Sequence, residues 1–448
     1  MSVTALRPQR AELPTELWYH IFRLATEVEG EFDPLLWSQK HTEAPLRDLF
    51  TSSVFSTYIR ATRSAIEASF PTRRAITTVS RRWRATGITI LYSSVTLKSH
   101  ANMIVFLDIL EQSARGNAQS RGPARCVKRI TFGPSRFAKF EDSERTMARI
   151  LPLCTELVIL VDDGPASGPG QFPFPAFPPL IQCPNLRYIF GEKSIAPIPS
   201  PEPWKWLSSM KNLRAITLEI YERDFEYNTS SQASLPALHL PHLHTLQFTD
   251  KGSTVAQSVS TWNLPSLRNL VFTEENSSRA FYYILKAHGH KIERLVFTCG
   301  FRKDDDESEN DLELSIPSLL RLKFLSIPLL EPDELPSFIP FITSPNLQVV
   351  EFPIDIHYIM PPGEESFDYL TLGEVDLESV PEVLDFLLDA GETPSLQIIR
   401  LLKKSPGRAR ALKYWLKKLE KKLWERGVRL QVEWGMGDSR VAHYYSGS

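Results

Sequence analysis

The sequence predicts an α/β fold, in which a helical N-terminal domain precedes an irregular solenoid with parallel strands on one face and helices on the other. Three observations predict it. A short apolar signature recurs from residue 127 onward, helix-like stretches separate its copies, and a different, helical spacing of apolar residues fills much of the first hundred residues. Stacked strand-plus-helix units bury their apolar faces against one another, which produces a solenoid.

The recurring signature is L-x-x-L-x-L, with exchange among Leu, Ile, Val and Phe. Its last two apolar positions are two residues apart, so both side chains leave the same side of a short strand. The clearest copies are Leu213-Ile216-Leu218, Leu243-Leu246-Phe248, Leu267-Leu270-Phe272, Ile292-Leu295-Phe297, Leu319-Leu322-Phe324, Leu347-Val350-Phe352 and Leu396-Ile399-Leu401. Weaker copies are Val127-Ile130-Phe132, Leu157-Leu160, Leu186-Ile189 and Phe367-Leu370-Leu372.

The copies recur at a mean spacing of about 27 residues, which lies within the range of roughly 20–29 residues found in leucine-rich repeats. Individual spacings vary, so the solenoid is expected to be irregular. Several copies begin with Pro-x-Leu, where proline ends the preceding helix and starts an extended segment. The asparagine that follows the strand in regular leucine-rich repeats is replaced here by Thr, Gly or an acidic residue, which argues against an evenly curved horseshoe.

Helices are expected between the copies and at the C-terminal end. Between Ser278 and His288, Phe281, Ile284 and Leu285 have the spacing of one helical face. A basic segment with an apolar stripe predicts a capping helix at about 406–426, and a strand is expected at 428–434. The alternative for this basic helix is a membrane surface or a partner groove.

The N-terminal region has the apolar spacing of helices. Residues 13–25 read L-P-T-E-L-W-Y-H-I-F-R-L-A, with proline at the helix start and apolar residues over more than half the circumference. A second helix is expected at about Thr72 to Thr86, and a third segment at Ile88 to Tyr92 continues into the strand-like S-S-V-T-L. A helix with this much apolar surface needs partners on two sides.

These residues carry a resemblance to a known family. L-P-x-E-L-x-x-x-I-F, V-S-R-R-W-R and I-L-Y resemble the F-box, and an F-box followed by leucine-rich repeats is similar to a large class of fungal F-box proteins. The resemblance implies a non-catalytic substrate receptor of a ubiquitin ligase, which docks the Skp adaptor and, through it, cullin and RING subunits. The residues carried over as adaptor-binding are Leu13, Pro14, Leu17, Ile21, Val79 and Trp83.

The two halves of the motif are separated by an insertion at about 26–71, with helix expected around Leu46 to Ala68. The predicted domains are therefore residues 1–97, F-box-like, and residues 98–448, the solenoid with its C-terminal cap. Two alternatives stay open. The N-terminal helices could simply cap the solenoid, and the protein could be a repeat scaffold or sensor without ligase association.

Composition and motif content limit the classes of partner and site that are expected. Lys plus Arg total 51 against 53 for Asp plus Glu, so no global charge favours nucleic acid or an anionic membrane. No signal-peptide pattern and no run of eighteen apolar residues occurs, so the cytoplasm or the nucleus is expected. Common nucleotide-binding, hydrolase and metalloprotease motifs are absent, so no catalytic residues, cofactor or metal are predicted, and a hydrolase or transferase is the third choice.

Three local features of the sequence could indicate other sites. His239, His242 and His244 are interpreted as surface histidines, and the acidic run 304–309 lacks the glycine of a calcium loop. The Pro- and Gly-rich stretch 162–179 is expected to be a long loop. None of the three is predicted to bind a ligand.

Target binding is expected on the outward strand face, between and just after the inward-pointing apolar pair. The outward set is Thr245, Gln247, Asn269, Val271, Arg294, Val296, Arg321, Lys323, Val349, Glu351 and Arg400. Arg294, Arg321, Lys323 and Arg400 are predicted to bind the unidentified protein target. The first three would form a basic patch for an acidic or phosphorylated segment; ordinary solvated charge is the alternative.

Overall fold

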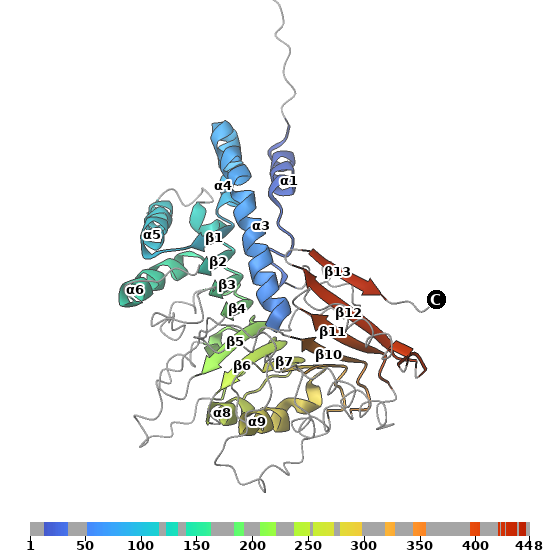
Figure 1. The fold of residues 1–448 in the computed structure, drawn as a ribbon. Helices are drawn as coiled ribbons and strands as arrows, with labels where there is room; N and C mark the ends of the chain where they lie inside the picture. The colour runs from blue at the N-terminus through green and yellow to red at the C-terminus, as the bar shows by residue number, and fades with distance from the viewer. Residues whose placement is uncertain are drawn as a thin grey trace, which may run out of the picture. The chain divides into compact units, whose positions relative to one another are not determined.

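A computed structural model describes residues 13–34, 52–115, 122–132, 140–162, 183–191, 207–220, 237–250, 254–272, 278–297, 319–327, 344–354, 395–403, 420–421, 423–425, 427–436 and 439–444 (Figure 1). The chain divides into two compact units. The first comprises residues 1–49, 54–172 and 176–193, and the second comprises residues 50–53, 173–175 and 194–448. The first unit thus holds both the N-terminal helices and the first repeat strands.

The first unit contains four parallel strands that pair in chain order. Figure 1 shows α5 and α6 on one side of these strands and the long helix α3 on the other. Its elements are α1 (Thr15–Thr26), α3 (Ser52–Val79), α4 (Arg81–Leu91), β1 (Ser94–Leu97), α5 (His100–Arg115), the 3-10 turn η1 (Pro123–Cys126), β2 (Arg129–Phe132), α6 (Phe140–Ile150), the 3-10 turn η2 (Leu151–Leu153), β3 (Ile159–Asp162) and β4 (Tyr188–Gly191).

The second unit continues the repeat with parallel strands in chain order, and its last strand is antiparallel. Its elements are β5 (Ala215–Ile220), β6 (Thr245–Asp250), α8 (Thr254–Ser260), β7 (Asn269–Phe272), α9 (Ser278–His288), the 3-10 turn η7 (Gly289–Lys291), β8 (Arg294–Phe297), β9 (Phe324–Ser326), β10 (Val349–Ile354), β11 (Ile398–Lys403), β12 (Arg429–Met436) and β13 (Ser439–Tyr444). The predicted α/β architecture of parallel strands and helices is confirmed.

The core of the second unit is a row of aliphatic side chains, one from each parallel strand. The strand register aligns the fourth residue of every signature, and each of these residues is buried. Burial of such side chains is the main favourable contribution to stacking the repeats. The row is Ile216, Leu246, Leu270, Leu295, Leu325, Val350, Ile399 and Leu430.

A hydrogen-bonded turn precedes most strands. Six residues before most aliphatic-row positions, a backbone carbonyl accepts from the N–H three residues later, as in Leu264 to Leu267 at 3.3 Å and Ser344 to Leu347 at 3.1 Å. Pro265 and Pro345 occupy the second position of these turns, where the fixed φ of proline fits. The Pro-x-Leu element is therefore part of a turn, and not only the extended start that the sequence suggested.

One predicted copy is out of register. Leu319-Leu322-Phe324 and Leu322-Leu325-Ile327 both fit the signature, but Leu295 pairs with Leu325, so the second set is correct. Leu322 instead occupies the turn position, where its N–H donates to the Leu319 carbonyl at 2.9 Å. A shift of this kind changes which side chains face outward.

The other repeat predictions have mixed outcomes. The helix Ser278–His288 is confirmed as α9, and the strand at 428–434 is confirmed as part of β12. The weak copy at Phe367 lies outside the described residues, and β10 pairs directly with β11. The expected cap at 406–426 lies mostly outside the described residues, although residues 420–421 and 423–425 are helical.

His288 links helices α8 and α9 of the second unit. Its ring is buried at the end of α9, and its Nε2 donates to the Val259 carbonyl of α8 at 3.3 Å. Lys291 Nζ donates to the Nδ1 atom of His288 at 3.2 Å and to the Leu264 carbonyl at 3.1 Å. Burial, and then the charge of Lys291, lower the pKa of His288 to about 4.

The second unit should therefore lose stability in acid. An unfolded histidine has a pKa of about 6.5, so between pH 6.5 and 4 the unfolded chain binds a proton that folded His288 does not. Between pH 7 and pH 4.5 this difference removes roughly 2–3 kcal/mol of stability. His288→Gln keeps a donor for Val259 but does not titrate, so urea unfolding of the variant should depend less on pH by about that amount. Parallel losses in both proteins would contradict this role.

Candidate functional site

Helix α1 is apolar on two faces. Pro14 precedes it with φ -51° and ψ 150°, its carbonyl accepts from the Trp18 N–H at 3.2 Å, and Glu16 in the first turn complements the helix dipole. Phe22 is buried and Trp18 is partly buried, whereas the remaining large apolar residues of this helix are exposed. One face of α1 therefore packs against the rest of the first unit, and the other face is exposed to solvent.

The inward face of α1 packs in an aromatic cluster. Trp83 of α4 lies 4.7 Å from both Trp18 and Phe22, measured between ring centroids, and Ile76 and Ile90 complete the cluster. Aromatic side chains contribute large buried areas and rigid geometry. The cluster fixes α1 against α3 and α4.

The chain reverses between α3 and α4 at Ser80. The Ser80 hydroxyl accepts from the Trp83 N–H at 3.1 Å, which is an N-cap for α4. Gly87 allows the close approach of the two helices, since a Cβ atom there would lie 2.7 Å from Cγ2 of Ile76. The predicted single helix from Thr72 to Thr86 is therefore wrong; α3 ends at Val79 and α4 begins at Arg81.

The outward face displays aliphatic side chains from the motif. Arg82 Nη2 donates to the Leu13 carbonyl at 3.0 Å, which ties the Leu-Pro turn to α4. Val79 lies one turn beyond Ile76 at the end of α3. The side chains of this set are 40% to 73% exposed, and the set, called here the outer apolar face, is Leu13, Leu17, Ile21, Leu24 and Val79.

The structure separates the six residues carried over from the F-box. Leu13, Pro14, Leu17, Ile21 and Val79 are exposed, whereas Trp83 is half-buried in the aromatic cluster. Contact with an adaptor is therefore open to the first five. Trp83 packs against Phe22, Ile76 and Ile90 and supports the helices.

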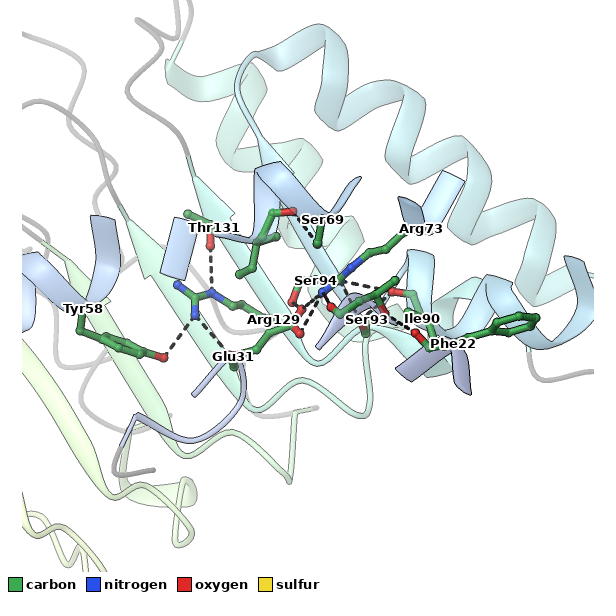
Figure 2. Close-up of polar contacts among 12 residues, drawn as sticks. Phe22, Glu31, Tyr58, Ser69, Arg73, Ile90, Ser93, Ser94, Arg129 and Thr131 are labelled. Carbon is green, nitrogen blue, oxygen red and sulfur yellow. Dashed lines mark hydrogen bonds and ion pairs between the residues drawn. The ribbon is translucent and has the colours of Figure 1, made fainter. Parts of the chain in front are cut away.

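A buried ion pair joins the segment after α1 to α3 (Figure 2). Nη2 of Arg73 donates to both carboxylate oxygens of Glu31 at 2.9 and 3.0 Å, and both side chains are almost fully buried. Arg73 also donates to the carbonyls of Ile90 and Thr26 at 3.3 and 3.2 Å, and the Ser94 hydroxyl of β1 donates to Glu31. Hydrogen bonds of this kind compensate for desolvating the two charges.

Arg129 of β2 extends these contacts across the outward strand face. Its Nη1 donates to the backbone carbonyl of Glu31 and to the Tyr58 hydroxyl, both at 3.2 Å. Its Nη2 and Nε donate to the hydroxyls of Thr62 and Thr131 at 3.1 and 3.3 Å. The guanidinium is fully buried, so these acceptors replace water. Arg129, Arg73, Glu31 and their partners are called here the buried polar network (Figure 2).

Tyr58 shows how α3 closes the outward strand face of the first unit. Its hydroxyl donates to the Gly30 carbonyl at 2.9 Å; Gly30 has a φ of 67°, a region that favours glycine. Burial raises the pKa of Tyr58 to about 12, while Arg129 lowers it and Tyr188 of β4 raises it. Because α3 lies over this face, the outward residues of β2, β3 and β4 are buried: Arg129, Thr131, Ile159, Val161, Tyr188 and Phe190.

The helix expected around Leu46 to Ala68 is present from Ser52 onward as part of α3. Its role differs from that of a peripheral insertion, because Tyr58, Thr62 and Arg73 anchor the network. The sequence alone does not identify these residues as a network. The available signals are weak: one arginine in a short strand, and one glutamate after a glycine.

The predicted target-binding patch is not assembled as expected. Arg294 is 3% exposed, and its guanidinium carbon lies 3.7 Å from the centroid of the Phe324 ring. Its register partner on β9 is Phe324, because of the shifted copy. Most of the other outward positions of the second unit are buried too, among them Thr245, Asn269, Val271, Val296, Val349 and Glu351.

The remaining predicted residues lie elsewhere. Arg321 is exposed in the turn before β9, and Lys323 pairs with Glu293 at 3.0 Å. Arg400 on β11 is the register partner of Glu351 on β10. Target binding by these residues stays a prediction, but one continuous patch on an open strand face does not form.

Among the residues that the structure describes, no group of three or more His, Cys, Asp or Glu side chains is placed to hold a metal ion. His239 and His242 are exposed, and burial, then Arg214 and Arg268, lower the pKa of His244. The acidic run 304–309 and nearly all of the stretch 162–179 lie outside the described residues.

Comparisons with known proteins give no family assignment: no family model matches the chain, and no curated protein is significantly similar to it. Within the described ranges, no helix combines the length and the apolar character needed to cross a membrane. The functional interpretation therefore depends on the motif and on the geometry described above.

The buried polar network should dominate the stability of the first unit. Glu31→Ala leaves Arg73 buried without its carboxylate, which typically costs about 3–5 kcal/mol. Amide hydrogen exchange in α3 and β2 should accelerate by roughly two to three orders of magnitude. The matched control is Arg149→Ala, which removes the exposed pair with Glu111 and should cost less than about 1 kcal/mol. Equal effects of the two substitutions would refute the assignment.

Proposed function

We propose that this chain is the substrate-recognition subunit of a Skp/cullin/F-box ubiquitin ligase. Its outer apolar face docks the Skp adaptor, and its repeats bind a target protein. Cullin and RING subunits join through the adaptor and carry out ubiquitin transfer, so the chain itself needs no catalytic residue. Such a receptor works in the cytoplasm, the nucleus or both.

The observation that carries the proposal is the coincidence of motif and exposure. In L-P-x-E-L-x-x-x-I-F, the leucines and the isoleucine are at least 40% exposed, while the phenylalanine is 2% exposed. A helix needed only as a cap would turn its aliphatic side chains inward. Aliphatic residues grouped on one exposed surface are typical of a protein-binding site.

The support beneath the outer apolar face favours tight docking. Trp18 and Phe22 on the inward side of α1 pack against Trp83 of α4, and Arg82 holds the Leu13 backbone. Side chains on a rigid surface lose less conformational freedom on binding, which leaves more of the contact energy for affinity.

The second candidate is a repeat scaffold or sensor that does not associate with a ligase. It is favoured by the position of α3, because the insertion that interrupts the F-box-like motif packs on the strands through Tyr58 and Thr62. This packing gives the insertion a structural role that does not depend on adaptor binding. A pull-down of the full-length protein, probed for the Skp adaptor and cullin, distinguishes the two candidates.

Leu17→Asp should remove the Skp adaptor from such a pull-down. Leu17 is 47% exposed, so an aspartate there stays solvated in the free protein but loses water in the complex. A loss of about 2.7 kcal/mol weakens binding roughly a hundredfold. The matched control is Val105→Asp on α5, where Val105 is 60% exposed, and it should bind like wild type.

Trp83→Ala separates support from contact. It should also weaken adaptor binding, but together with a lower Tm, because it removes the centre of the aromatic cluster. Leu17→Asp should leave Tm within a few degrees of wild type. Undiminished adaptor recovery by Leu17→Asp would show that the helices are only a cap.

A further inference from the structure

One exposed row of charged and polar side chains crosses the second unit at the starts of its strands. Each member lies two residues before the aliphatic-row position of its repeat, and backbone hydrogen bonds join consecutive members. The N–H groups of His244, Arg268, Glu293 and Lys323 donate to the carbonyls of Arg214, His244, Arg268 and Glu293 at 2.8, 3.0, 2.9 and 2.8 Å. The five residues, Arg214, His244, Arg268, Glu293 and Lys323, are called here the strand-start row.

Among the described residues of this unit, the row brings together exposed and partly exposed polar side chains. The described outward strand positions are mostly buried, as Asn269 and Arg294 are. By contrast, His244 and Lys323 are exposed, and Arg214, Arg268 and Glu293 are partly exposed. The shifted register puts Lys323 in this row and not on the outward face beside Arg294.

The row is positively charged even though the whole chain is nearly neutral. Arg214, Arg268 and Lys323 stand against one carboxylate, Glu293, which Arg268 and Lys323 share at 3.5 and 3.0 Å. Lys291 and Arg321 add positive charge nearby. The local field is seen at His244, whose pKa is lowered by burial and then by Arg214 and Arg268. It is seen again at Lys291, whose pKa is lowered by burial and then by Arg268.

The spacing suits an extended chain. Neighbouring strands are about 4.8 Å apart, so five rungs span roughly 19 Å. An extended peptide rises about 3.3 Å per residue and covers that length with about six residues. Guanidinium and ammonium groups form charge-assisted hydrogen bonds with carboxylates.

We propose that the strand-start row binds an extended, Asp/Glu-rich segment of a protein partner. This rests on the proposed function only in identifying that partner as the ligase target. The row replaces the basic patch that the sequence suggested, and it shares Lys323 with it.

The probe is a fluorescent ten-residue peptide with eight glutamates, titrated with the full-length protein at low salt, where surface charges are least screened. Arg214→Glu with Arg268→Glu should weaken binding at least tenfold. The matched control, Arg74→Glu with Arg84→Glu, changes two exposed arginines of the first unit by the same charge and should change binding less than twofold. Equal weakening by both double variants would overturn the proposal, because binding would then follow net charge alone.

Glu293→Gln provides a test that misfolding cannot imitate. It removes the carboxylate shared by Arg268 and Lys323 but keeps a hydrogen-bond acceptor, so peptide affinity should rise about threefold. Unchanged or weaker binding would overturn the proposal, as would failure of wild type to bind the peptide. Binding of a single-stranded RNA oligonucleotide in place of the peptide, lost in the Arg214 and Arg268 variant, would assign the row to nucleic acid instead. The titration contains no adaptor, so failure of adaptor docking leaves its outcome unaffected.

Discussion

The buried ion pair between Arg73 and Glu31, with Arg129 beside it, joins three parts of the first unit that are distant in sequence. The segment after α1, the helix α3 and the strands β1 and β2 each supply part of the network. A buried charge is strongly destabilising without its partners, so these parts order together or not at all. The network also fixes the position of α3, which carries Ile76 and Val79. Since α1 packs against Ile76, the network indirectly positions α1.

This constraint changes how the repeats are used. In an open solenoid, outward strand positions are available for partners. Here α3 lies over those positions in the first unit, where Arg129 donates a hydrogen bond to the Tyr58 hydroxyl in place of water. The equivalent described positions of the second unit are largely buried. Exposed side chains are therefore found at the starts of the strands and on α1, and both proposed binding surfaces lie there. The proposed binding surfaces follow from which side chains the fold leaves exposed to water, not from the repeat pattern alone.

The repeat pattern was predictable because a two-residue alternation identifies buried strands, and most copies matched, such as Leu246 and Leu270. It failed at Leu319, where two overlapping copies fit equally well and only pairing with Leu295 decides between them. The outer apolar face was foreseeable from the motif. The buried polar network was not, because single charged residues such as Glu31 look like surface residues until distant segments enclose them.

Under the proposed function, the free energy of binding at the outer apolar face depends on all five of its aliphatic side chains together. Burying the exposed part of its five aliphatic side chains contributes roughly 4–7 kcal/mol. Association costs about 4–15 kcal/mol in lost freedom, so these side chains alone bring binding only near balance. Net binding then requires two further contributions. The first is additional contacts at Pro14 and around the helix, and the second is an underlying side-chain cluster that does not rearrange on binding. Trp18 and Trp83 supply the second, since their rings are already packed against each other in the free protein, with centroids 4.7 Å apart. Under the proposed function, this partly buried aromatic pair contributes to affinity without touching the partner.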